Sequence, residues 1–319
     1  MKKIDILLST YNGAQYIREL LDSVFCQTNE DWSLIIRDDG SFDTTVDIIR
    51  EYIQKYPGKV VLITDDLGRL GPKLSFGQLL KLSQAPYLMF CDQDDIWRAD
   101  KIEISLHKIL ALEDKFSAQM PLLIFMNSML VDDRGRILVE DAWKYMGITP
   151  EIGQRFRNII LRNIFIGHTM MMNRSLVALA LPIPEESIMH DWWVGLTASA
   201  FGRTDYISEP RVLYRQHQNN FLGFNKMSLI DFILKHQSPF REYVEFQQRM
   251  LNQSRYFCLR FKDLLTNHKG NLNFSDDIED VCKFVSLKEM PYMQRKLFLL
   301  NFYKDFPYRD KALIDILWY

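Results

Sequence analysis

The sequence predicts an α/β fold: a mostly parallel β-sheet with helices on both faces. Apolar strand-like segments alternate with helix-like segments through residues 4–95, and this order is typical of parallel sheets. Each of these strand-like segments also ends in polar residues. The chain has 319 residues, of which 47% are hydrophobic and 25% are charged. This size and composition suit a globular protein with one large domain or two smaller ones.

The individual elements follow from hydrophobic periodicity. Continuous apolar runs bounded by polar residues indicate buried strands, and apolar residues three or four positions apart indicate helices. The expected strands cover residues 4–10, 32–41, 59–66 and 86–95. The expected helices cover residues 11–28, 44–56 and 74–84.

Polar clusters follow all four expected strands. They are Ser9–Asn12, Asp38–Ser41, Asp65–Asp66 and Asp92–Asp95. In open α/β sheets, ligands bind outside the carboxyl ends of the strands, where these loops converge. The sequence therefore predicts a binding site at this edge of the sheet.

The stretch MFCDQDDIW places Asp92, Asp94 and Asp95 directly after an apolar run. Clustered carboxylates repel one another and resist desolvation, so a buried group needs a cation or a proton. No G-x-G-x-x-G or G-x-x-x-x-G-K-[ST] pattern occurs, which excludes NAD and P-loop nucleotide binding. Acids that bind ribose and base, together with acids that hold Mg²⁺ or Mn²⁺ against a diphosphate, favour a nucleotide-sugar ligand.

Charge and cysteine content indicate which ligands and which cellular compartment suit the protein. The formal net charge of −2 provides no basic surface for nucleic acid. The four cysteines are scattered without a C-x-x-C pair, which is typical of free thiols in a reducing compartment. The N-terminal run is too short and polar for a signal peptide, and no window reaches the roughly 18 apolar residues of a membrane span. We expect a cytoplasmic protein that contacts at most the inner face of the cell membrane.

Several motifs carry a family resemblance. LLSTYNGAQYIRELLDSVFCQT, IIRDDGSFDTT and MFCDQDDIWRADKI resemble the nucleotide-binding half of family 2 inverting glycosyltransferases of the GT-A fold. GHTMMMNRSL, IMHDWWVGLTASAFG and ISEPRVLYRQHQNN resemble bacterial rhamnosyltransferases that build surface polysaccharides. The resemblance covers roughly the first 225 residues in motif order.

The resemblance implies a donor site and a cation site. In the family pattern, base and ribose are held by the residues that match Thr10, Tyr11, Asn12 and Asp39. Asp65 or Asp66 would close the base pocket, Arg69 or Lys73 would reach the donor, and Gln93 would face it. Asp92 and Asp94 match the D-x-D pair: Asp92 would contact the ribose or water around the ion, and Asp94 would coordinate Mg²⁺ or Mn²⁺ directly. The role of Asp95 is not separable from that of Asp94.

The second half supplies the remaining expected roles. Asp191 aligns with the acid that serves as the general base, although an aspartate before an apolar helix also suits an N-cap. We expect one of Trp192 and Trp193 to stack on the acceptor sugar and the other to pack in the core, and His168 to approach the acceptor. After the last expected strand, Arg215 would meet phosphate oxygens, and His217 would meet phosphate or the metal.

The expected domains are a glycosyltransferase domain over residues 1–223 and a helical region over 224–319. The first domain would divide into a nucleotide-sugar half, residues 1–110, and an acceptor half, residues 111–223. The tail shows helical spacing in residues 227–237, 241–265 and 293–306. Its basic and aromatic helices suit either an anionic membrane surface or packing on the protein itself or a second subunit as a homodimer.

The resulting hypothesis is a metal-dependent inverting glycosyltransferase that moves L-rhamnose from dTDP-L-rhamnose onto a saccharide or lipid-linked glycan. One alternative keeps the fold but uses a UDP-hexose donor such as UDP-glucose or UDP-galactose. Another is a nucleotide-sugar-binding protein without turnover, which would not need Asp191. A nucleotidyltransferase is disfavoured because STYNGAQ lacks a basic glycine-rich phosphate loop.

Overall fold

A computed structural model describes residues 3–217, 238–267, 275–303 and 307 of the chain. These residues form two compact units. The first unit lies within Met1–Gln154, Ile164–Glu185 and Met189–Phe224. The second lies within Arg155–Asn163, Glu186–Ile188 and Asn225–Tyr319, so two short segments of the expected first domain group with the tail. The domain boundary near residue 223 stays a prediction.

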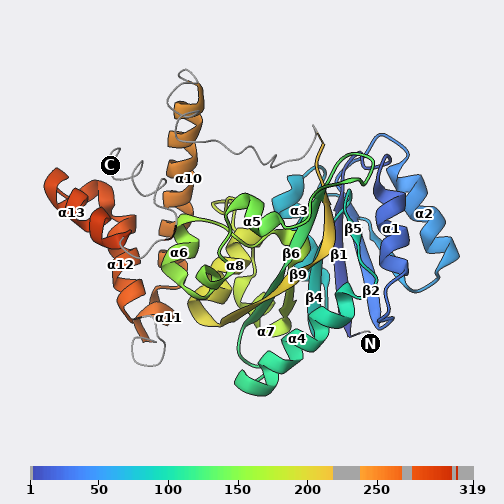
Figure 1. Ribbon diagram of the computed structural model, residues 1–319, viewed down its shortest axis with the longest axis horizontal. Helices are drawn as coiled ribbons and strands as arrows, with labels where there is room; N and C mark the ends of the chain where they lie inside the picture. Colours follow the sequence, from blue (N-terminus) through green and yellow to red (C-terminus); the bar gives the residue numbers. More distant parts are fainter. Residues whose placement is uncertain (1–2, 218–237, 268–274, 304–306, 308–319) are drawn as a thin grey trace. The chain divides into compact units, whose positions relative to one another are not determined.

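The first unit is built on one nine-stranded sheet with the order β3-β2-β1-β4-β8-β6-β9-β5, and β7 pairs with β6 (Figure 1). Both expected halves of this domain contribute strands to it. The strands are β1 (Ile4–Thr10), β2 (Trp32–Asp38), β3 (Val60–Ile63), β4 (Tyr87–Asp92), β5 (Ile96–Trp97), β6 (Leu122–Val131), β7 (Ile137–Val139), β8 (Met171–Asn173) and β9 (Arg203–Arg215).

The first four strands are parallel to one another, as the alternation of strands and helices predicts. Their register places the ends of β1, β2 and β4 side by side. Ser9 lies opposite Arg37 on one side and opposite Asp92 on the other, and Thr10 lies opposite Asp38. The polar clusters after these three strands therefore meet at one edge of the sheet.

Helices cover both faces of the sheet, which confirms the predicted α/β class. The even-numbered residues of β1 share one buried core with three amphipathic helices: α1 (Ile17–Phe25), α2 (Thr45–Lys55) and α4 (Lys101–Phe116). On the opposite face, Phe90 of β4 contacts Phe76 of α3 and His190 of α8. The helices of that face are α3 (Gly71–Leu82), α7 (Arg174–Ala180) and α8 (His190–Phe201).

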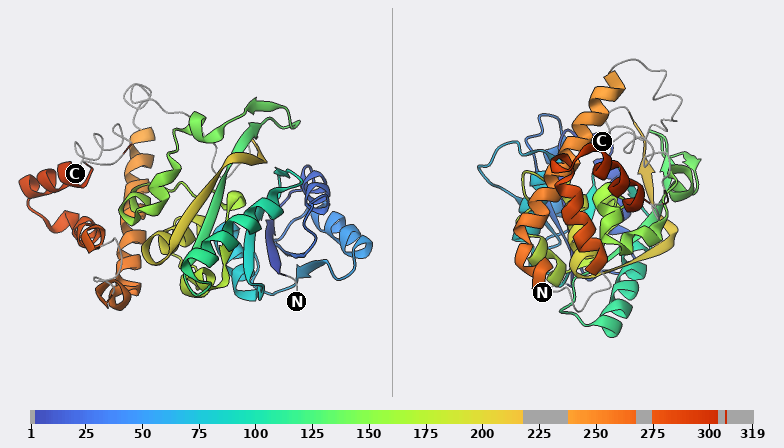
Figure 2. Two further views of the ribbon diagram at one scale, coloured as in Figure 1. Left: turned by 60° about the horizontal axis from the view of Figure 1, so that its bottom comes forward. Right: turned by 90° about the vertical axis from the view of Figure 1, so that its left-hand side faces the viewer.

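The later strands make the sheet mixed rather than mostly parallel. β8 is antiparallel to both β4 and β6, whereas the long strands β6 and β9 lie side by side in parallel (Figure 2, left). β8 covers only three residues, because residues 167–169 just before it form a 3₁₀ turn, η2. Thr169 Oγ1 donates to the carbonyl of Ile166 and supports this turn. α5 (Ala142–Met146) and η1 (Pro150–Gln154) complete the unit.

The second unit is helical in its described residues. Its helices are α6 (Phe156–Leu161), α10 (Ser238–Arg260), α11 (Lys262–Asn267), α12 (Ser275–Val285) and α13 (Tyr292–Phe302). The helix expected over 241–265 is interrupted at Phe261, and the helix expected over 227–237 lies outside the described residues. Rings of Phe156 and Phe257, and of Phe284 and Phe302, pack against each other. Across the described ranges, no helix is both long and apolar enough to cross a bilayer.

Candidate functional site

Residues Asp92–Asp95 form a turn with three carboxylates, here called the acidic turn, which lies between two strands of the sheet. β4 ends at Asp92 and β5 begins at Ile96, so Asp94 and Asp95 belong to the connection. β5 pairs with β9 through Ile96 and Leu213, and this anchors the far side of the turn. The carboxylates of this turn face two different histidines, His168 and His217.

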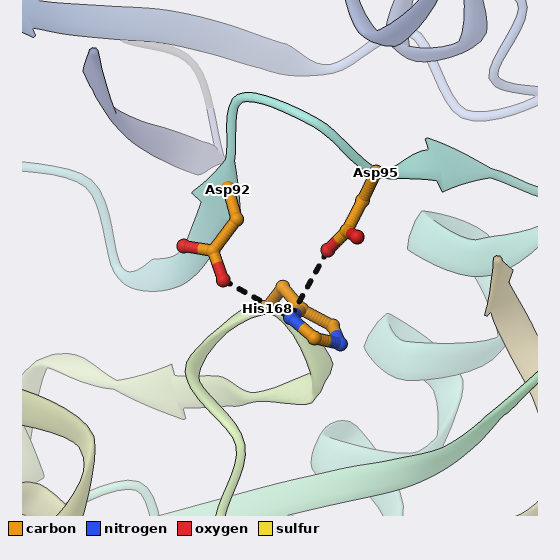
Figure 3. A group of neighbouring side chains, drawn as sticks. All are labelled: Asp92, Asp95 and His168. Atoms are coloured by element: carbon orange, nitrogen blue, oxygen red, sulfur yellow. Dashed lines mark hydrogen bonds and ion pairs between the residues drawn. The ribbon is translucent and has the colours of Figure 1, made fainter. Parts of the chain in front are cut away.

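Asp92 and Asp95 both face His168 (Figure 3). His168 Nδ1 lies 3.1 Å from Asp92 Oδ2 and 3.0 Å from Asp95 Oδ2. Burial alone would lower the pKa of His168, but the charges of Asp95 and Asp92 outweigh burial and raise it. Burial also raises the pKa of Asp95 to about 8. Both shifts favour retention of a proton within this group, and such a proton reduces the repulsion between the two carboxylates.

Lys101 supports this cluster from α4 and is a residue that the sequence did not single out. Its ammonium group is fully buried, donates to the carbonyl of His168 at 2.7 Å, and lies 3.2 Å from the centre of the Trp97 ring. Burial lowers the pKa of Lys101 to about 7. His168 is thus fixed from both its backbone and its side chain, away from an open surface.

Asp94 faces the other histidine. Its Oδ2 lies 2.8 Å from Nε2 of His217, which follows the end of β9. The imidazole of His217 stacks on the ring of Tyr16, with ring centroids 5.0 Å apart. The side chains of Asp94 and His217 are 18% and 13% exposed, whereas those of Asp95 and His168 are fully buried. Of the two clusters, only the Asp94–His217 pair and the edge of Asp92 are open to a ligand.

Arg215 is enclosed by the protein. Its Nε donates to the carbonyl of Asp94 at 2.8 Å, one terminal nitrogen donates to the carbonyl of Asp133 at 2.7 Å, and the other pairs with Glu19. Only 1% of the side chain is exposed. Direct contact with a diphosphate stays a prediction, and in this structure the guanidinium group binds protein groups instead.

Asp191 lies in the first turn of α8 and is not its N-cap, because the helix begins at His190 and Met189 occupies the cap position. Its two carboxylate oxygens accept hydrogen bonds from the backbone N–H groups of Gly167 and Trp192. Burial raises the pKa of Asp191 to about 7, and the negative charge of Asp92 acts in the same direction. The candidate base is therefore close enough to the acidic turn to interact electrostatically with it.

The neighbours of Asp191 are also buried. His190 stacks on Phe76 at 4.1 Å, and burial lowers its pKa to about 4, so it is neutral. Trp193 donates from Nε1 to the carbonyl of Ala180, which is a core contact. Trp192 is only 3% exposed. The structure opens neither tryptophan ring to solvent, and an acceptor contact by either ring or by His168 stays a prediction.

The expected donor residues gather around the end of β1. Thr10 Oγ1 donates to Asp38, and Asn12 accepts from the backbone of Phe42 through its side chain. Tyr11 and Gln93 are joined by two hydrogen bonds, from Tyr11 N to Gln93 Oε1 and from Gln93 Nε2 to the Tyr11 carbonyl. Gln93 thereby ties the loop after β1 to the acidic turn.

The backbone at Gly13 lies so close to the Gln93 side chain that a Cβ atom at this position would collide with it. A Cβ atom at Gly13 would lie 2.3 Å from Gln93 Oε1, much closer than any real Cβ contact. An alanine at this position would push Gln93 away from Tyr11. The glycine in the sequence Asn12-Gly13-Ala14 after β1 is therefore explained by its packing against Gln93 as well as by the turn.

Arg37 joins two of the predicted acids and was missed at the sequence level. Its guanidinium group is 2% exposed and pairs with Asp39 and Asp65, the latter through Nε at 2.8 Å. Asp39 also accepts from the backbone N–H groups of Leu70 and Gly71 at 2.8 and 2.7 Å. The only sequence signal for this role is a charged residue inside an apolar strand.

The remaining donor candidates follow β3: Asp66 and Arg69 lie on the loop, and Lys73 lies in the first turn of α3. Arg69 places its guanidinium carbon 3.9 Å from the centre of the Tyr11 ring, which brings it to the end of β1. Lys73 donates to the carbonyl of Glu185. Asp66 is exposed. Arg69 thus lies with the expected donor residues, whereas Lys73 is occupied by the loop before α8.

The chain is similar to known proteins in sequence. Residues 5–178 match the family model described as "Glycosyl transferase family 2". A dTDP-rhamnosyl transferase, RfbG of Shigella flexneri, is 27% identical over 225 residues, which covers 68% of this chain and 74% of that protein.

Solved structures show the same fold. S. aureus TarS 1–349 in complex with UDP-GlcNAc has a TM-score of 0.54 and 16% sequence identity, covering 98% of this chain and 89% of that one. The mannosyltransferase PcManGT from Pyrobaculum calidifontis, in complex with GDP-Man and Mn²⁺, has a TM-score of 0.50 and 13% identity, covering 99% and 87%. These likenesses confirm the predicted GT-A fold.

Proposed function

The chain belongs to glycosyl transferase family 2, and from this premise we propose that it transfers L-rhamnose from dTDP-L-rhamnose to a saccharide or lipid-linked glycan, with inversion. The observation that carries the proposal is a buried carboxyl group, Asp191, beside the acidic turn at the carboxyl edge of the sheet. The similarity to a dTDP-rhamnosyl transferase supports the choice of donor. Surface polysaccharide synthesis is the corresponding pathway class.

Asp191 is proposed as the general base. A catalytic base works best when its pKa lies near the working pH, and burial brings the pKa of Asp191 to about 7. The acceptor hydroxyl oxygen forms a bond to the anomeric carbon while the bond from that carbon to the diphosphate oxygen breaks. Asp191 takes the hydroxyl proton. The hydrogen bonds from Gly167 and Trp192 keep the carboxylate in place during this step.

Asp94 and His217 are proposed to hold the divalent cation. Their ligand atoms lie 2.8 Å apart on partly exposed side chains. A carboxylate oxygen suits Mg²⁺ or Mn²⁺, and the imidazole nitrogen favours Mn²⁺ of the two. When bound, such an ion offsets the negative charge that grows on the departing diphosphate. The group of Asp92, Asp95 and His168 offers three possible ligands, but Asp95 and His168 are sealed from solvent. We therefore assign Asp92 to the ribose or to water around the ion.

The nucleotide is proposed to bind over the end of β1. Thr10, Tyr11, Asn12 and Asp39 surround this point, and Arg37 orients Asp39 and Asp65 by pairing with both carboxylates. The Asp65 pKa is lowered by its hydrogen bond to Arg37. These carboxylates accept hydrogen bonds from the base and the ribose, and Arg69 beside Tyr11 lies within reach of the donor.

A UDP-hexose is the second candidate donor. This alternative is supported by the solved structures of the same fold: TarS is in complex with UDP-GlcNAc, and PcManGT is in complex with GDP-Man and Mn²⁺. Identity to these proteins is below 20%, so they do not assign the donor here. A nucleotide-sugar-binding protein without turnover is disfavoured by the buried, backbone-bonded carboxyl group of Asp191, which has no part in donor binding.

The helical tail is proposed to act at the inner membrane face, where a lipid-linked acceptor would lie, or in a homodimer. α13 carries exposed apolar side chains at Met293, Leu297 and Leu300, spaced along one side of the helix. Lys296 borders them on the same side, whereas Arg295 lies on the opposite side and donates to the carbonyl of Met290. This pattern suits an anionic lipid surface and equally a second subunit, and a binding experiment separates the two.

A donor screen tests the proposed function. Release of dTDP, UDP or GDP is measured from a panel of nucleotide-sugars, with and without Mn²⁺, and with a mixture of saccharide acceptors. We expect the fastest release from dTDP-L-rhamnose and a loss of release when Mn²⁺ is removed. Release that is fastest from a UDP-hexose would replace the donor, and no release from any donor would favour a binding protein.

A further inference from the structure

We propose that Arg215 and Tyr16 are positioning residues that hold Asp94 and His217 as one preformed cation site. This inference rests on the proposed function, because it concerns the site assigned to the cation. Neither residue touches the reacting atoms in this proposal. Their part is to fix two ligands that come from distant points of the chain, the turn after β4 and the segment after β9.

Arg215 holds the acidic turn at two points, the backbone carbonyl of Asp94 and the side-chain carboxylate of Asp95. Its Nε donates to the carbonyl of Asp94 at 2.8 Å, and its own backbone N–H donates to Asp95 Oδ1 at 3.1 Å. Rotation of the backbone at Asp94 would break the first bond and strain the second. The backbone of Asp94 is therefore held in place, and its carboxylate lies 2.8 Å from Nε2 of His217.

The other side of the guanidinium group joins this turn to two further elements. One terminal nitrogen donates to the carbonyl of Asp133, in the turn between β6 and β7, and the other pairs with Glu19 of α1. A guanidinium group carries five donors in a rigid plane, so one side chain reaches three partners at once. A lysine ammonium is a compact point charge and does not reproduce this fork. The ion pair with Glu19 also offsets the cost of burying the charge.

Tyr16 closes the arrangement. Its ring stacks on the imidazole of His217, at 5.0 Å between centroids and 22° between planes. The guanidinium carbon of Arg215 lies 4.8 Å from the centre of the same ring. The contacts therefore run in a closed circuit from Asp94 to His217, to Tyr16, to Arg215 and back to the Asp94 carbonyl. This circuit orients the imidazole so that Nε2 faces the Asp94 carboxylate.

If Arg215 and Tyr16 hold the two ligands in place, replacing either residue should weaken Mn²⁺ binding. Groups that orient metal ligands from outside the coordination sphere typically change metal affinity by about 10- to 100-fold when they are removed. We expect Arg215→Lys and Tyr16→Leu each to weaken Mn²⁺ binding by about 10-fold. Tyr16→Phe keeps the ring and should restore the affinity of the native protein.

The experiment measures Mn²⁺ affinity of the full chain by electron paramagnetic resonance of free Mn²⁺, with dTDP and with UDP present in separate series. Arg211→Lys is the matched control, because Arg211 lies on the same strand and pairs with Asp100 instead. Its Mn²⁺ affinity should equal that of the native protein. Melting temperatures of all variants are recorded on the same preparations.

A merely structural role would lower the melting temperature without changing the Mn²⁺ affinity of the folded protein, and this result would overturn the proposal. If Asp94→Asn loses Mn²⁺ while Arg215→Lys and Tyr16→Leu bind it normally, the positioning role is wrong and the cation site stands. If Asp94→Asn also binds Mn²⁺ normally, the cation site of the proposed function is wrong. If Arg215→Lys does not fold, the contrast between Tyr16→Leu and Tyr16→Phe decides.

Discussion

Replacing Asp191 by asparagine changes both the chemistry and the pH dependence of stability. An amide does not accept the acceptor proton at neutral pH, so transfer should fall by roughly 100-fold or more. Donor binding should change little, because Asp191 is assigned to the acceptor side. The native rate should rise with pH through about pH 7, as the carboxyl group ionises, whereas the residual rate of the variant should not.

The stability effect follows from the raised pKa. In the unfolded chain Asp191 loses its proton near its ordinary value of 3.8, but in the folded protein it keeps the proton up to about pH 7. Between these values unfolding releases a proton, so the free energy of unfolding of the native protein falls as pH rises. The loss is about 1.4 kcal/mol per pH unit, or ~4 kcal/mol over the window. The contribution is fully present below pH 3.8 and lost above about pH 7.

Asparagine carries no titrating group and therefore escapes this loss. Its single side-chain oxygen replaces only one of the two acceptors that bind Gly167 and Trp192, which costs about 1 kcal/mol. The variant should be ~1 kcal/mol less stable than the native protein in acid and ~3 kcal/mol more stable above pH 7.

The assay combines urea unfolding at several pH values between 4 and 8.5 with transfer rate and donor affinity on the same preparation. Asp100→Asn is the matched control, because Asp100 pairs with Arg211 on another part of the sheet. A stability difference between native and variant that does not change with pH would refute the raised pKa. Transfer near the native rate would show that Asp191 is not the base.

Two further predictions concern the cation and the tail. Asp94→Asn should abolish the Mn²⁺-dependent part of dTDP affinity in calorimetric titration while leaving the melting temperature nearly unchanged, and an undiminished Mn²⁺ effect would remove Asp94 from the cation site. Replacing Leu297 and Leu300, which are 63% and 56% exposed, by glutamine should reduce sedimentation of the full chain with anionic liposomes. Equal sedimentation, with a change in oligomeric state, would favour a subunit interface instead.

The sequence was sufficient for features that depend on neighbouring residues. The strands ending at Thr10, Asp38 and Asp92 follow from local apolar runs, and the parallel arrangement predicts that their ends meet. The antiparallel strand β8 could not be predicted, because its three residues pair with strands far away in the chain. The break of the tail helix at Phe261 also has no clear local signal.

The parts of the site that the sequence did not predict depend on contacts between residues far apart in the chain. The motifs pointed to Asp92 and Asp94 as one pair, but the fold gives them different histidines, because His168 and His217 arrive from separate segments. Arg37 shows only that it is a charge inside an apolar strand, and Lys101 looks like a surface charge in the sequence, since burial of a charged side chain depends on partners elsewhere. The backbone bonds to Asp191 likewise arise from tertiary packing at Gly167.

The anomeric configuration of the transferred sugar tests the central claim most directly, because a single displacement assisted by a carboxylate base must invert it. The measurement uses nuclear magnetic resonance of the product formed from the preferred donor and the acceptor that gives the fastest nucleotide release. We predict a product with the configuration opposite to that of the donor sugar, formed by the native protein and nearly absent with Asp191→Asn. A product with retained configuration would contradict the role of Asp191 and the proposed mechanism.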